Sequence, residues 1–166
     1  MSITIIESGL QFGEYEENRL FHAEQSMIYR SLGKGISTVE FVLFNDPIEI
    51  LMIEAKSSSP QPSNQENFDD FIEDIYRKFA HSVDTYFSLV LNRLQDKENE
   101  MPECFRTADY SISKIRLILV INGHRIAWLP PIRDAIRRKL DRQVKIWRLE
   151  IAVINHLQAR ELGLLV

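Results

Sequence analysis

The sequence predicts an α/β fold in a single domain, with a mixed central sheet flanked by helices. Three features support this prediction. Strand-like runs of apolar residues flank a polar break at residues 45–47, a helical pattern of apolar residues extends over 68–94, and an apolar run at 114–121 is typical of a strand buried on both faces. The chain has 166 residues, of which 45% are hydrophobic and 27% charged, so it can bury a core and has an ordinary globular composition.

The N-terminal region is expected to contain a short strand and a helix. Residues 2–7 alternate weakly in polarity, which is typical of an edge strand, and a helix is expected from about residue 14 to residue 32, where Gly33 stops it. Helical spacing places Glu24 on the apolar stripe of this helix. A carboxylate there needs a partner or a function, so Glu24 is a candidate functional residue. The alternative is that Glu24 lies at the margin of the stripe and reaches solvent.

Residues 38–56 are expected to form a β-hairpin that carries three ionisable side chains within apolar strands. Strand side chains alternate between faces, so Glu54 and Lys56 share one face. A turn at 45–47 would pair Glu40 with Met52, which puts Glu40 on the same face as Glu54. Ionisable groups in apolar strands are costly unless they are paired or used, so these three residues are candidates for a functional site.

The long helix expected at 68–94 begins with a group of acidic residues. These carboxylates suit the positive end of the helix dipole and are expected to be solvated. They are Asp69, Asp70, Glu73 and Asp74. Lys78 and His81 are expected on the exposed side of the same helix.

The remaining elements follow in order. A polar connection is expected at 95–111, and the central strand at 114–121 comes next. A helix with proline in its first turn is expected from residue 130 or 131 to 140. A last strand is expected at 144–153, and a closing helix from Asn155 to Gly163.

The net charge of −4 conceals an asymmetry along the chain. Residues 1–100 carry 18 acidic and 8 basic side chains, whereas residues 101–166 carry 6 acidic and 12 basic ones. A basic half is compatible with a polyanionic partner. The candidate nucleic-acid contacts lie on the outer surface of the helix near 130–142, and the alternative is an ordinary solvated face. They are Arg133, Arg137, Arg138 and Arg142.

Cysteine content and hydropathy limit the possible cellular locations of the protein. The single cysteine, Cys104, excludes an internal disulfide, and no zinc-binding cluster of Cys and His is present. A reducing cytoplasm is therefore the expected location. The N-terminus lacks the pattern of a signal peptide, and no apolar run approaches membrane-spanning length, so no membrane association is expected.

The order of elements and the hairpin residues together resemble the PD-(D/E)xK nuclease superfamily, the restriction-endonuclease-like group. The match consists of Glu40 as the first acid, followed by Glu54-Ala55-Lys56 as E-x-K at a strand end, with helices on both sides of the sheet. Glu24 corresponds to the helix-one acid that some members add. The resemblance covers about residues 14–121, and the basic part at about 125–153 follows it. The family usually has Asp where this chain has Glu40.

The resemblance implies Mg²⁺-dependent (or Mn²⁺-dependent) hydrolysis of phosphodiester bonds in DNA. Glu40, Glu54 and Glu24 would hold the metal, because hard cations prefer carboxylate oxygens. Lys56 would orient the attacking water or stabilise charge on the phosphoryl group. Clustered acids repel one another, so at least one carboxyl pKa is expected to be raised. Members of the group often act as homodimers or with a protein partner.

Two other interpretations remain open from the sequence. One is a catalytically silent nuclease-like domain that binds protein or nucleic acid within a larger complex. The other is a plain structural domain, in which Glu54 and Lys56 form an ion pair and Glu40 is a charge that protects a sheet edge.

Overall fold

The computed structural model describes all 166 residues of the chain. The strands are β1 (Ser2–Glu7), β2 (Leu10–Glu16), β3 (Leu20–Phe21), β4 (Phe41–Asp46), β5 (Glu49–Lys56), β6 (Lys114–Ile121) and β7 (Leu149–Asn155). The helices are α1 (Met27–Ser31), α2 (Gln65–Val90), α3 (Glu103–Thr107), α4 (Leu129–Lys139), α5 (Asp141–Trp147) and α6 (His156–Glu161), with short 3-10 turns η1 (Glu17–Arg19) and η2 (Ile126–Trp128).

A mixed five-stranded sheet in the order β3-β4-β5-β6-β7 forms the centre of the molecule. The pairs β3–β4 and β4–β5 are antiparallel, and β5–β6 and β6–β7 are parallel. The carboxyl ends of β5, β6 and β7 therefore lie at the same end of the sheet, where antiparallel β4 begins. We call it the Lys56 end. The predicted α/β fold with a mixed central sheet is confirmed.

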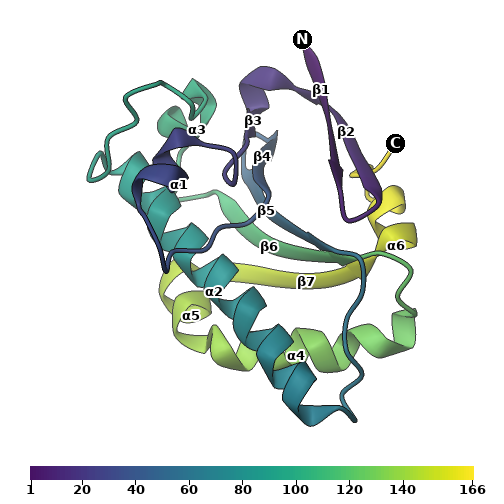
Figure 1. Cartoon of the computed structure of the whole chain (residues 1–166). Helices are drawn as coiled ribbons and strands as arrows, with labels where there is room; N and C mark the ends of the chain where they lie inside the picture. Colours follow the sequence, from purple (N-terminus) through teal and green to yellow (C-terminus); the bar gives the residue numbers. More distant parts are fainter.

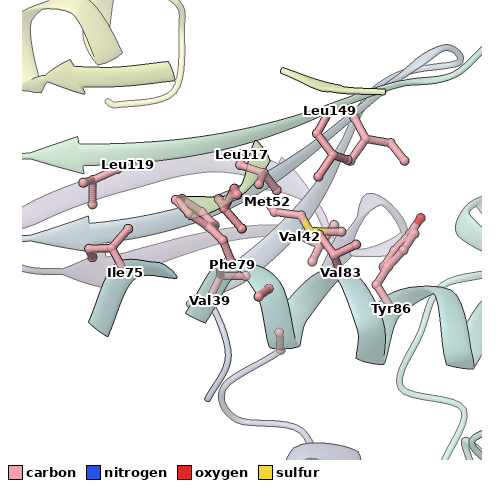
Figure 2. Close-up of a cluster of buried hydrophobic side chains, with 14 of the residues drawn as sticks. Val39, Val42, Met52, Ile75, Phe79, Val83, Tyr86, Leu117, Leu119 and Leu149 are labelled. Carbon is pink, nitrogen blue, oxygen red and sulfur yellow. The ribbon is translucent and has the colours of Figure 1, made fainter. Parts of the chain in front are cut away.

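Helices α2 and α4 cover one face of the sheet (Figure 1). Figure 2 shows the core between α2 and the sheet, where α2 side chains meet those of β5 and β6. Phe79 of α2, Met52 of β5 and Leu117 of β6 are all fully buried there. Burial on this scale fixes the rotation of α2, and thus which of its polar residues face the Lys56 end.

The β1–β2 hairpin and α6 cover the opposite face (Figure 1). Phe12 of β2 packs edge-on against Phe41 of β4, with ring centroids 5.4 Å apart. The Tyr15 hydroxyl donates a hydrogen bond of 2.8 Å to the Leu164 carbonyl, which ties the hairpin to the C-terminal residues. A second buried cluster of 16 apolar residues thus holds the hairpin on the sheet.

The helix predicted for residues 14–32 is wrong except at its end. Strand β2, η1 and β3 occupy residues 10–21, and only Met27–Ser31 of α1 is helical. The predicted strand at 2–7 is present, but it pairs with β2 in a separate two-stranded sheet. Strand pairing buries Phe12, Tyr15 and Leu20 against the central sheet, so tertiary burial overrides the helical spacing.

The strand predicted at 144–153 is wrong over its first residues, because Val144 to Trp147 belong to α5. Arg148 then adopts the left-handed conformation at φ 53°, which ends α5 before β7 begins at Leu149. The polar connection at 95–111 also contains α3, whose Phe105 is fully buried.

The other predicted elements are confirmed. Helix α2 occupies most of the predicted range, β6 matches residues 114–121, and α4 and α6 lie where the sequence placed them. None of the helices has both the length and the apolar character needed to cross a membrane.

Asn155 joins the end of β7 to the loop after β6. Its side-chain oxygen caps α6 by accepting a 3.0 Å hydrogen bond from the Gln158 amide. Its Nδ2 donates a 2.9 Å hydrogen bond to the His124 carbonyl. Asn155→Ala is expected to lower the free energy of unfolding by about 1–2 kcal/mol. Asn155→Asp keeps the acceptor that caps α6 but places a buried carboxylate oxygen against the His124 carbonyl, so it should also be less stable than the wild type in urea denaturation. Equal stability of Asn155→Ala and the wild type would contradict this account.

Candidate functional site

Glu40, Glu54 and Lys56 meet at the Lys56 end of the sheet, although the predicted register is wrong. Met52 pairs with Val42 instead of Glu40, because the turn consists of only Pro47 and Ile48 and a bulge lies between Phe44 and Asp46. The resulting shift is two residues. Since side chains alternate with a period of two, a shift of two leaves Glu40 on the face of Glu54.

Glu54 is a fully buried carboxylate with two lysines beside it. Its Oε1 lies 2.8 Å from Nζ of Lys78 and 3.3 Å from Nζ of Lys56. Its Oε2 is buried and makes no hydrogen bond. A buried carboxylate oxygen without a donor is costly, so this atom marks a place where a ligand would be stabilised.

Lys56 connects the buried carboxylate to the surface. Its ammonium also lies 3.0 Å from Oδ2 of Asp74 on α2, and the Lys56 side chain is 26% exposed to solvent. The Asp74 side chain is 50% exposed, so that ion pair is weak and water competes for it. Lys56 can therefore exchange Asp74 for another anion without leaving Glu54.

Glu40 joins Glu54 to a second group of acids. The nearest cation to Glu40 is the Lys78 ammonium, 3.9 Å from its Oε1. Carboxylate oxygens of Glu40, Glu24 and Glu7 lie within 4.8 Å of one another. These three residues come from different segments: Glu40 immediately precedes β4, Glu24 lies in the turn before α1, and Glu7 ends β1.

Glu24 reaches the site by a route that differs from the prediction. It lies in the turn before α1, not on the buried stripe of a helix. Its amide donates a 3.3 Å hydrogen bond to the Glu40 carbonyl, which fixes the turn beside the start of β4. Glu24 therefore lies beside Glu40, as expected from the sequence, but it comes from a turn instead of a helix.

The predicted rise of a carboxyl pKa is confirmed. Burial, a hydrogen bond with Glu24 and repulsion from Glu54 and Glu24 raise the pKa of Glu40 to about 9. Burial also raises the pKa of Glu54, and the two lysines oppose this rise. Burial acts to lower the pKa of Lys78, but the surrounding carboxylates outweigh it and raise that pKa.

Two residues of the site were missed in the sequence. Lys78 was expected to be exposed, but its side chain is only 15% exposed and its ammonium lies between Glu54 and Glu40. Asp74, Lys78 and Ser82 follow one another at four-residue spacing, so they lie on one side of α2, and Ser82 is buried. This spacing could have indicated that Lys78 faces the sheet. Glu7 gave no signal, because nothing in the sequence showed which segment the first strand would meet.

Ser82 helps to position Glu40. Its hydroxyl accepts a 2.9 Å hydrogen bond from the amide of Val39, and it lies 3.2 Å from the Thr38 hydroxyl. This buried contact fixes the chain immediately before Glu40 against α2. Helix α2 thus both supplies Lys78 and places the residue that Lys78 contacts.

The four candidate arginines are exposed and none forms an ion pair with the acids of the site. Arg133 pairs with its neighbour Asp134, and Arg137 borders a hollow of about 260 Å³ beside β7. A neighbouring basic residue, Lys139, pairs with Glu73 of α2 at 2.5 Å. The basic surface of α4 therefore lies on the α2 side of the sheet, separate from the acids.

The donor set fits a hard divalent cation. Carboxylate oxygens are the ligands that Mg²⁺ and Mn²⁺ prefer, Glu40 and Glu54 are both buried, and Oε2 of Glu54 has no hydrogen-bond partner. Comparison of the sequence with protein-family models and curated proteins, and of the structure with solved structures, finds no match. The chemical interpretation therefore depends on this geometry.

The raised pKa of Glu40 predicts how stability depends on pH without metal. Between the ordinary carboxyl pKa of 4.5 and about 9, the folded protein holds a proton that the unfolded chain has lost. The free energy of unfolding therefore falls as the pH rises through this window, by up to about 1.4 kcal/mol per pH unit for one proton. Glu40→Gln has no such proton to lose, so in EDTA it should melt above the wild type at pH 8, and the difference should shrink at pH 5. Melting curves with the same pH dependence for both proteins would refute this prediction.

Proposed function

We propose that the protein is a metal-dependent nuclease that hydrolyses phosphodiester bonds in DNA. The observation that carries this proposal is the meeting of Glu40, Glu54 and Lys56 at one end of a mixed sheet. The pattern resembles the site of the PD-(D/E)xK superfamily, and assignment to the restriction-endonuclease-like fold is part of the proposal.

Glu40, Glu54 and Glu24 would hold Mg²⁺ or Mn²⁺. When bound, such an ion neutralises charge on phosphoryl oxygens and lowers the pKa of water. Glu54 would offer Oε2, since its Oε1 is engaged by two lysines. Lys78 would keep this carboxylate ionised and oriented.

Lys56 is the group that would meet the substrate. Its partly exposed ammonium can leave the solvated Asp74 for a phosphoryl oxygen or for the attacking water, while Glu54 retains its position. A fixed positive charge placed where negative charge develops lowers the activation barrier.

The basic surface of α4 and the start of α5 is proposed to contact the DNA backbone. Arg133, Arg137, Arg138 and Arg142 are exposed, and arginine is well suited to phosphate oxygens. A homodimer or a protein partner would extend this surface, and the free thiol of Cys104 accords with the proposed cytoplasmic setting.

Substitution of Lys56 tests the proposed activity. Lys56→Ala is expected to reduce DNA cleavage in Mg²⁺ or Mn²⁺ by about 100-fold or more, because the developing charge loses its stabilising partner. The matched control is Lys97→Ala, which removes an exposed lysine that forms no ion pair. Single- and double-stranded DNA should both be tried, and thermal melting should show that each variant is folded. Cleavage by Lys56→Ala at the wild-type rate would remove Lys56 from the mechanism.

One observation favours a second candidate function, a silent nuclease-like domain that binds protein or nucleic acid. The Lys78 ammonium lies 2.8 Å from Glu54 and 3.9 Å from Glu40, so a built-in cation already joins the two acids. In a silent domain this lysine would replace the metal permanently.

Metal titration separates the two candidates. Binding of Mg²⁺ or Mn²⁺ to the folded state raises the melting temperature as the concentration passes the dissociation constant. The nuclease proposal predicts a rise that is lost in Glu40→Gln. The silent domain predicts no rise at millimolar metal, and that result would exclude a metal-dependent activity at this site.

A further inference from the structure

The tip of the β1–β2 hairpin is attached to the Lys56 end of the sheet. The Ser8 hydroxyl donates a 3.0 Å hydrogen bond to the carbonyl of Ala55, which lies within the E-x-K segment. Nδ2 of Asn122 donates a 3.1 Å hydrogen bond to the Ser8 carbonyl. Gly9 is required at this contact, because its φ is +75° and a Cβ would lie 3.1 Å from Nδ2 of Asn122. The hairpin therefore holds its last β1 residue, Glu7, beside the candidate site.

Glu7 and Glu24 bring negative charge to Glu40 without any ion pair of their own. Oxygens of the three carboxylates lie within 4.8 Å of one another, and the nearest ammonium to Glu40 is 3.9 Å away. The Glu40 side chain is only 8% exposed and accepts no hydrogen bond from an N–H donor. A buried carboxylate with two acids around it and one ammonium at 3.9 Å would be stabilised further by a cation bound among the acids.

We infer that Glu7, Glu24 and Glu40 together bind a divalent cation, and that the N-terminal hairpin is thereby part of the functional site. Three carboxylates from separate segments offer hard oxygen ligands within 4.8 Å of one another, and the Lys78 ammonium lies 3.9 Å from Glu40 and 2.8 Å from Glu54. Glu54 shares Lys78 with Glu40, and its buried Oε2 has no hydrogen-bond partner. The inference rests on the proposed function only for the choice of Mg²⁺ or Mn²⁺.

The test is a calorimetric titration of the full chain with Mn²⁺, repeated with Mg²⁺. Glu7→Gln should weaken Mn²⁺ binding by about 10-fold or more, since loss of even an outer partner of a metal ligand costs this much. The matched control is Glu16→Gln, which removes one exposed carboxylate from the same hairpin, at the end opposite the tip. It should bind Mn²⁺ as the wild type does.

A second variant separates ligation from simple loss of charge. Glu7→Asp keeps the negative charge but has a shorter side chain, so it should also weaken Mn²⁺ binding. It replaces Glu7→Gln in the test if that variant does not fold. Wild-type affinity in both variants would overturn the inference, and so would a wild-type protein that does not bind Mn²⁺.

DNA cleavage is measured on the same samples, so that failure of the inference and failure of the proposed function are told apart. A wild type that binds Mn²⁺ through Glu7 but leaves DNA intact would support the metal site and refute the nuclease. A wild type that cleaves DNA while Glu7→Gln binds and cleaves equally well would support the nuclease and refute the role of Glu7.

Discussion

The burial of the Glu54 carboxylate is the constraint on which the rest of the site depends. Removing an ionised carboxylate from water costs several kcal/mol unless cations and hydrogen bonds replace its hydration. Lys78 and Lys56 replace part of it at Oε1, while Oε2 has no replacement. The cation proposed above would supply the partner that Oε2 lacks.

The fold supplies the two lysines by different routes. Lys56 comes from the same strand as Glu54, and strand alternation is enough to place it. Lys78 depends on the rotation of α2, which is fixed by Phe79 and its neighbours in the core. A change in packing far from the surface would therefore move an ammonium at the site, which links core packing to the electrostatics of the carboxylates.

The sequence predicted the parts of the site that depend on local periodicity. The pairing of Glu40 was wrong by two residues, but a shift of two preserves the face, so Glu40, Glu54 and Lys56 were still expected together. Strand β6 was found because a strand buried on both faces reads as a continuous apolar run. Helix α2 was found because its apolar stripe is long.

The missed parts depend on contacts between segments that are distant in the sequence. Glu7 belongs to the site only because the hairpin tip bonds to Ala55 and Asn122, and no local pattern encodes that contact. The helix expected around Glu24 failed because burial against the sheet outweighs a helical spacing that several short segments share by chance.

The charges at the Lys56 end would suit the proposed divalent cation better than a monovalent one. Four glutamates and two lysines leave a net charge of about −2 when all are ionised, and Asp74 is half exposed and screened by water. Without metal, the raised pKa of Glu40 reduces this charge by retaining a proton. A divalent cation removes the need for that proton, so binding releases it, and affinity should increase with pH over the range in which stability without metal decreases. The same buried carboxylate would thus account both for the fall in stability with pH and for the affinity of the proposed cation site.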